Sequence, residues 1–145
     1  MANRRVYPRV EPAHGFLYEP TGLQVTRTTD GVDDLYSQVS NYLKNPFNSK
    51  QKESFIESFN ERLSLLWGPP GTGKTTVLAG IIMGWVENAW QSGSHITIGV
   101  GASNYNAIDN VLREILDLLR NRQQKLGGLP TAVRVARLRS QSAKS

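Results

Sequence analysis

The chain contains no cysteine, only two histidines and two methionines, and no long hydrophobic run. Without cysteine there are no disulfides and no cysteine-ligated metal sites, which fits a reducing compartment such as the cytoplasm. No stretch of about eighteen apolar residues occurs, so the sequence predicts no membrane span. The basic start of the chain is followed by Pro8, Glu11, Pro12 and His14 rather than by an apolar segment, which argues against a secretory signal. These absences favour a cytoplasmic protein without a membrane partner.

Acidic residues are also in the minority, with 12 against 17 Lys and Arg, so the net charge is +5 and the isoelectric point is near 9.7. A basic isoelectric point is typical of proteins that bind nucleic acids, but many mildly basic soluble proteins do not. Several of the basic residues lie near the two ends of the sequence, where they can simply be solvated. The charge is therefore compatible with a nucleic-acid partner without establishing one.

Residues 1–44 predict a small N-terminal segment made of a hairpin and a helix. Two short extended pieces at 15–19 and 23–28 flank a Pro-Thr-Gly turn and can pair as a hairpin. From residue 30 to about 44 the apolar residues recur with helical spacing, and a proline follows.

Residues 45–145 alternate between helical and extended patterns. Helices are expected at about 49–60, 75–90 and 106–125, and apolar runs predict buried strands at 63–67, 95–100 and, more weakly, 132–136. From residue 63 on, the order strand, helix, strand, helix, strand predicts an α/β fold of the P-loop NTPase (RecA-like) type, with a parallel sheet and flanking helices. A complete core of this type has more strands, so we expect an incomplete sheet and a chain that is part of a larger protein.

One motif is specific for nucleotide. The pattern G-x-x-x-x-G-K-[ST] is met by Gly68, Pro69, Pro70, Gly71, Thr72, Gly73, Lys74 and Thr75. The glycines allow backbone conformations in which the N–H groups of the loop cradle phosphates at a helix N-terminus. Lys74 then reaches the β- and γ-phosphates, and the hydroxyl of Thr75 binds Mg²⁺. The sequence thus predicts a site for a nucleoside triphosphate and Mg²⁺ that includes Thr76, with Lys74 and Thr75 as catalytic residues.

Two other segments have both a functional and a purely structural interpretation. Asn48 and Gln51 precede the loop, and on local sequence alone they form a helix capping box. Ser103, Asn104 and Tyr105 follow the second predicted strand, where they can contact phosphates and stack on a base. Ser103 or Asn104 can equally be the N-cap of the next helix.

Together these segments resemble the superfamily 1B helicases, the group of the nonsense-mediated-decay helicase, over roughly residues 45–139. In that family an Asn-x-x-Gln segment precedes the P-loop, and here it matches Asn48 and Gln51. The family's motif Ia typically reads Ser-Asn-x-Ala-x-Asp, and this chain is one residue longer there. The strand-contacting pair of the family therefore falls on Ser103 and Asn104, or on Asn104 and Tyr105.

The resemblance implies an ATP-dependent helicase that acts on single-stranded DNA or RNA. It implies that Gln51 binds adenine and that Ser103, Asn104 and Tyr105 line the path of the strand. On the family pattern residues 45–145 are the N-terminal part of the first ATPase domain. The acidic Mg²⁺ motif, the arginine motifs and the second RecA-like domain then lie beyond residue 145. We therefore expect this chain to be inactive by itself and to need the remainder of the helicase as a partner.

Two alternatives stay open. The first is an AAA-type or other P-loop ATPase, which would carry an Asp-Glu pair at the end of a later strand. Residues 129–138 contain no carboxylate, which counts against this alternative. The second is a non-catalytic remnant that binds nucleotide or nothing.

Overall fold

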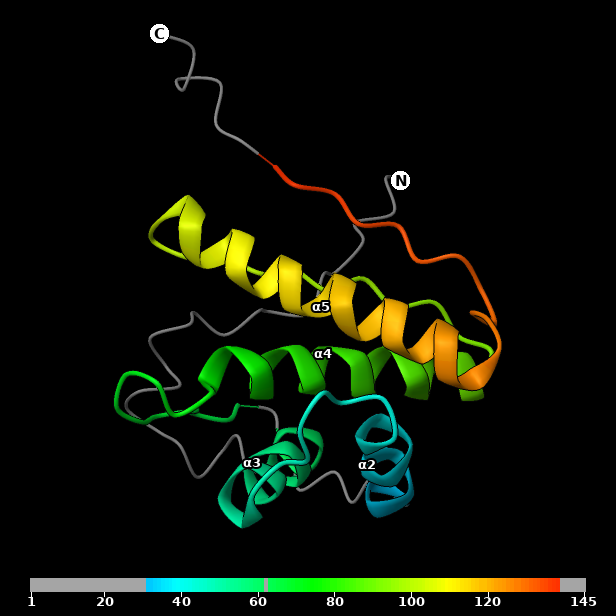
Figure 1. Cartoon of the computed structure of the whole chain (residues 1–145), viewed down its shortest axis with the longest axis horizontal. Coiled ribbons are helices and arrows are strands. Elements are labelled where there is room, and N and C mark those ends of the chain that lie inside the picture. The colour runs from blue at the N-terminus through cyan, green and yellow to red at the C-terminus, as the bar shows by residue number, and fades with distance from the viewer. Residues whose placement is uncertain (1–30, 62, 139–145) are drawn as a thin grey trace, which may run out of the picture.

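The computed structural model describes residues 31–61 and 63–138, which form four α-helices. These are α2 (Val32–Ser40), α3 (Ser49–Asn60), α4 (Lys74–Gln91) and α5 (Tyr105–Leu126). In Figure 1, α4 lies at the centre, with α2 and α3 on one side and α5 on the other. The four predicted helices are confirmed, although α2 is shorter than predicted. The predicted hairpin at 15–19 and 23–28 lies outside the described residues.

The predicted parallel sheet, and with it the α/β fold class, is wrong. Within the described ranges the three segments expected as strands, 63–67, 95–100 and 132–136, are neither helical nor paired. Leu65 and Trp67, expected inside a buried strand, are 91% and 85% exposed. An apolar run reports only on side chains, whereas a strand forms only when its backbone N–H and C=O groups find a neighbouring strand. Here α4 is covered on both sides by helices.

The core forms between these helices from side chains at helical spacing. Its fully buried members include Val39 of α2, Tyr42 just after that helix, Phe55 of α3 and Met83 of α4. Leu118 of α5 belongs to the same cluster, so one continuous core joins all four helices. Burial of a side chain of this size stabilises the fold by about 1.5–3 kcal/mol.

Two glycines let α4 approach its aromatic neighbours closely. A Cβ atom at Gly80 would lie 2.6 Å from Cζ of Phe47. At Gly84 a Cβ would lie 2.7 Å from Cζ of Phe59 and 2.8 Å from Cζ of Phe55. Glycine is normally unfavourable inside a helix, so these two positions trade helix propensity for close packing.

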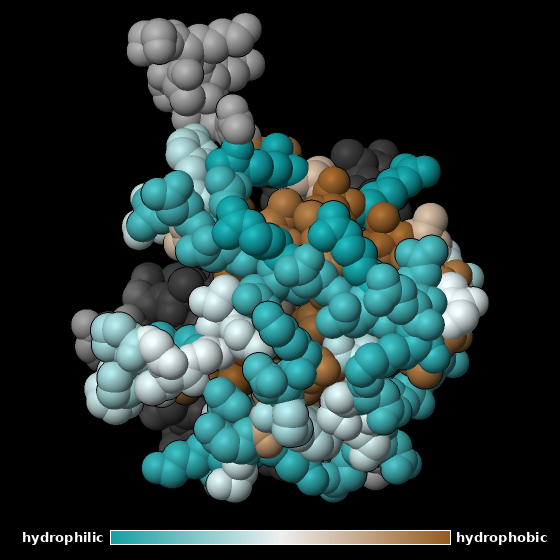
Figure 2. Space-filling view, viewed as in Figure 1, coloured by the Kyte–Doolittle hydropathy of each residue, from teal (hydrophilic) through white to brown (hydrophobic). Residues whose placement is uncertain are grey.

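Viewed in the same direction, the surface is mostly hydrophilic, and its largest apolar area lies in the upper half of the picture (Figure 2). Among the residues that the structure describes, no helix is both long and apolar enough to cross a membrane.

Candidate nucleotide-binding site

The glycine-rich loop leads directly into α4. Gly71 and Gly73 have φ angles of +81° and +79°, in the left-handed region that favours glycine. Gly73 is the N-cap of α4, and a Cβ atom there would lie 2.8 Å from Nε2 of Gln51. The hydroxyl of Thr72 donates a hydrogen bond to the carbonyl of Pro69 at 2.9 Å, which closes the loop on itself. The sequence therefore builds a tight turn in front of the positive end of a helix of 18 residues.

Lys74 is the first residue of α4, and its side chain folds back into the loop. Its ammonium group donates to the carbonyls of Gly68 and Pro69 at 2.5 and 2.7 Å. The ammonium group is attracted more strongly to phosphate oxygens than to these carbonyls, because the phosphate oxygens carry negative charge and the carbonyls are neutral. The loop thus keeps the ammonium group at the place where the predicted phosphates would bind.

Gln51 connects the start of α3 to the same loop. Asn48 is the N-cap of α3, and the capping box is complete: Asn48 Oδ1 accepts from the Gln51 N–H at 2.9 Å, and Gln51 Oε1 accepts from the Asn48 N–H at 3.0 Å. The structural interpretation of these two residues is therefore confirmed. Gln51 Nε2 also donates to the Thr72 carbonyl at 3.0 Å, which the capping box does not require. The side-chain amide still has one N–H and one oxygen lone pair for another partner.

Thr75 and Thr76 follow in the first turn of α4 and are half-buried. No cluster of three His, Cys, Asp or Glu side chains suited to a metal ion occurs in residues 31–61 and 63–138. The donors near the loop are a threonine hydroxyl and backbone groups, which suit a Mg²⁺ ion that keeps most of its ligands as water and phosphate oxygens. The residues present thus fit magnesium bound together with a nucleotide.

The loop proposed for nucleic acid lies at the N-terminus of α5. Asn104 is the N-cap, and its side chain accepts from the Ala107 N–H at 2.8 Å, so the capping interpretation of Asn104 is confirmed. Tyr105 is 40% exposed, and the guanidinium carbon of Arg137 lies 5.4 Å from the centre of its ring. Figure 1 shows α4 and α5 side by side with their N-termini at the same end, so both candidate loops share that end.

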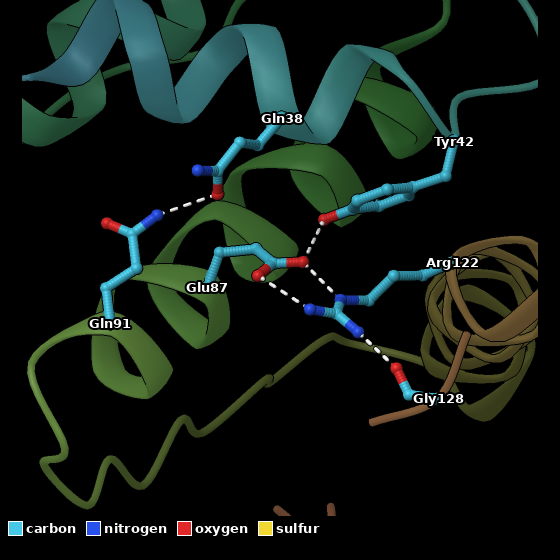
Figure 3. Close-up of polar contacts among 6 residues, drawn as sticks. All are labelled: Gln38, Tyr42, Glu87, Gln91, Arg122 and Gly128. Atoms are coloured by element: carbon cyan, nitrogen blue, oxygen red, sulfur yellow. Dashed lines mark hydrogen bonds and ion pairs between the residues drawn. The ribbon is translucent and has the colours of Figure 1, made fainter. Parts of the chain in front are cut away.

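A buried ion pair at the other end of these helices was missed by the sequence analysis (Figure 3). Arg122 Nε and Nη2 lie 2.5 and 3.2 Å from the two carboxylate oxygens of Glu87. The Tyr42 hydroxyl donates to the same carboxylate at 3.1 Å, and Arg122 Nη1 donates to the Gly128 carbonyl. Glu87 and Arg122 are only 3% and 7% exposed. Burial, followed by the charge of Glu87, raises the pKa of Tyr42 far above its ordinary value, so its hydroxyl stays protonated.

One signal in the sequence could have revealed this pair. Glu87 lies on the α4 stripe that also carries Val77, Gly80 and Gly84, which are all buried. Arg122 lies in the same way on the buried stripe of α5. One acid and one base, each within the apolar stripe of a neighbouring helix, indicate a buried pair, because an isolated buried charge is very costly.

Comparison with known protein families identifies the class. A protein-family model described as an AAA domain matches residues 46–145, more than half of the sequence. The chain belongs to this family. The match supports a superfamily 1 helicase-like P-loop ATPase domain, for which nucleotide and Mg²⁺ use are expected in general. The match does not separate subfamily 1B from the other helicases of superfamily 1.

A curated relative is the NFX1-type zinc finger-containing protein 1 homolog of Caenorhabditis elegans, 33% identical over 88 residues. The alignment covers 58% of this chain and 4% of that protein, so the chain spans only a small part of the relative's length. No solved structure matches the chain significantly.

Proposed function

We propose that this chain is the ATP-binding portion of a nucleic-acid-dependent helicase of superfamily 1B, which couples ATP hydrolysis to translocation or unwinding. The observation that carries the proposal is the contact of Gln51 with the phosphate loop. The capping box alone does not explain that contact. It brings a base-recognising amide next to a phosphate-binding loop.

Binding of ATP gives new partners to three side chains. Lys74 moves from the carbonyls of Gly68 and Pro69 to the β- and γ-phosphates, and the hydroxyl of Thr75 binds Mg²⁺. Gln51 uses its remaining N–H and lone pair on the adenine edge, whose adjacent donor and acceptor match an amide. The Mg²⁺ ion held by Thr75 would supply positive charge that offsets the charge of the phosphates. Residues 68–76 hold and orient the triphosphate.

The nucleic-acid partner is a single strand of DNA or RNA that passes the N-terminus of α5. Ser103 and Asn104 provide hydrogen-bonding groups there, and Tyr105 provides a ring for stacking. Asn104 already caps α5 through its carbonyl oxygen, so its side-chain N–H₂ group is the part that would reach the strand. A stacked base contributes on the order of 1–3 kcal/mol, so Tyr105 is the dominant residue of this proposed contact.

The test of the nucleotide site is equilibrium binding of Mg-ATP and Mg-CTP to the 145-residue chain, measured by calorimetry. Lys74→Ala should abolish detectable binding of both, with the exposed Lys50→Ala as the charge-matched control that leaves binding intact. Unchanged ATP affinity in Lys74→Ala would show that the loop does not hold the phosphates.

Gln51 needs a separate control because it also caps α3. Gln51→Ala should weaken ATP by about 1 kcal/mol more than CTP, the contribution of a typical hydrogen bond. Asn48→Ala breaks the same capping box but leaves the Gln51 amide in place, so it should affect both nucleotides equally. If Gln51→Ala behaves like Asn48→Ala, Gln51 does not select adenine and the helicase assignment loses its main support.

A further inference from the structure

The described part of the chain ends in a segment, residues 129–138, that follows α5 and contacts its N-terminal turns again. Arg137 Nη2 donates to Asp109 Oδ2 at 2.8 Å, and Nε lies 2.7 Å from Oδ1 at an angle too bent for a hydrogen bond. The side chains of Arg137 and Asp109 are only 23% and 36% exposed. The guanidinium also covers part of the Tyr105 ring. Arg137 therefore contacts two residues of α5, Asp109 and Tyr105.

Asp109 creates an electrostatic problem for a nucleic-acid site at this position. It lies one helical turn after Tyr105 on α5, so its carboxylate is on the same side of the helix as the tyrosine. An unpaired carboxylate beside a passing phosphodiester would repel it. The ion pair with Arg137 neutralises that charge and holds the guanidinium carbon over the ring of Tyr105, 5.4 Å from its centre.

We propose that Arg137 is a positioning residue of the strand site: it neutralises Asp109 and holds Tyr105 for stacking without itself contacting the phosphates. This proposal rests on the function proposed above for the loop 103–105. It assigns a role to a residue more than thirty positions away in sequence, outside every motif of the sequence analysis.

The experiment measures binding of fluorescein-labelled oligo-dT and oligo-U, each about 15 nucleotides long, to the 145-residue chain by anisotropy at low and high salt. Arg137→Gln should weaken binding about fivefold at low salt and much less at high salt, because the exposed charge of Asp109 is then screened. Asp109→Asn alone should tighten binding. The double variant Asp109→Asn/Arg137→Gln should recover most of the loss, since neither charge remains.

Arg134→Gln is the matched control, because Arg134 is an exposed arginine of the same segment. Any loss in Arg134→Gln should not be recovered by Asp109→Asn. A double variant that binds as weakly as Arg137→Gln would overturn the proposal, since Arg137 would then act on the strand directly. A loss that persists at high salt and follows a fall in melting temperature would reduce Arg137 to a structural role.

The two proposals fail in different ways. If the wild-type chain does not bind the oligonucleotides, or if Tyr105→Ala leaves binding unchanged, the strand site is contradicted. The role of Arg137 is then contradicted as well. Binding that Tyr105→Ala weakens, combined with no recovery in the double variant, contradicts only the role of Arg137.

Discussion

The substitution Glu87→Gln should be among the most damaging that the described part of the chain can receive. It preserves the shape of the side chain but removes the charge that pairs with Arg122, which is 7% exposed. Breaking a buried ion pair by removing one partner costs about 3–5 kcal/mol, because the other charge stays buried without compensation. Small domains have a total stability of about 5–15 kcal/mol, so this loss is a large part of it. The melting temperature should fall by about 10–20 °C.

The measurement is urea unfolding followed by the helical circular dichroism signal. Glu87→Gln should lower the urea midpoint while the slope of the transition stays the same. The matched control is Asp117→Asn, which breaks the pair with Arg120 on α5, at a distance of 3.0 Å and with side chains 58% and 71% exposed. An exposed pair of this kind contributes at most about 1 kcal/mol.

A second variant separates the charge from the packing. Replacing both partners together, as Glu87→Leu/Arg122→Met, removes the buried charges and should restore a stability close to that of the wild type. The reasoning is refuted if Glu87→Gln costs no more than Asp117→Asn, or if the double apolar variant is as unstable as Glu87→Gln.

Two more predictions concern the core. Burial raises the pKa of Tyr42 in the folded state above its value in the unfolded chain, which is about 10. As the pH rises, the tyrosine therefore loses its proton first in the unfolded state, which favours unfolding. The stability should fall above about pH 10, by up to 1.4 kcal/mol per pH unit. Tyr42→Phe should remove this part of the alkaline loss, which unfolding curves between pH 8 and 11 would detect and Tyr36→Phe would not reproduce. Gly84→Ala should destabilise the chain by about 1–3 kcal/mol despite its better helix propensity, because its Cβ meets Phe55 and Phe59. Stability at or above wild type in Gly84→Ala would show that the rings can move aside.

The helices were predictable from the sequence because the signals for each helix lie within its own segment and at its two ends. A helix makes its backbone hydrogen bonds within one segment, so apolar spacing, an N-cap such as Asn48 and a final glycine such as Gly127 suffice to locate it. A strand depends on a partner elsewhere in the chain. The run that ends at Trp67 has the composition of a buried strand, yet the side chain of Trp67 is 85% exposed. The apolar run is present in the sequence, but whether it forms a strand depends on a neighbouring strand that the run itself does not specify.

In the candidate site, too, the features set by neighbouring residues were predictable and the contacts between distant residues were not. The loop 68–75 was predictable because eight consecutive residues determine its shape, and Gly71 and Gly73 do adopt positive φ angles. The ion pairs of Arg122 and Arg137 were not predicted, because their partners lie 35 and 28 residues away. Gln51 is intermediate: its capping role follows from residues three apart, whereas its contact with Thr72 depends on how α3 packs beside α4.

The buried pair and the candidate site also depend on each other through helix geometry. Glu87 lies about 20 Å along α4 from Lys74, at 1.5 Å per residue, and Arg122 lies still farther along α5 from Tyr105. The pair therefore joins the two helices near their C-terminal ends, while the loops with Lys74 and Tyr105 lie at the opposite ends (Figure 1). The two helices also pack against each other through the core, so the ion pair is one of several contacts that set how their N-terminal ends lie relative to each other. Glu87→Gln should thus weaken nucleotide and strand binding together, although it touches neither loop.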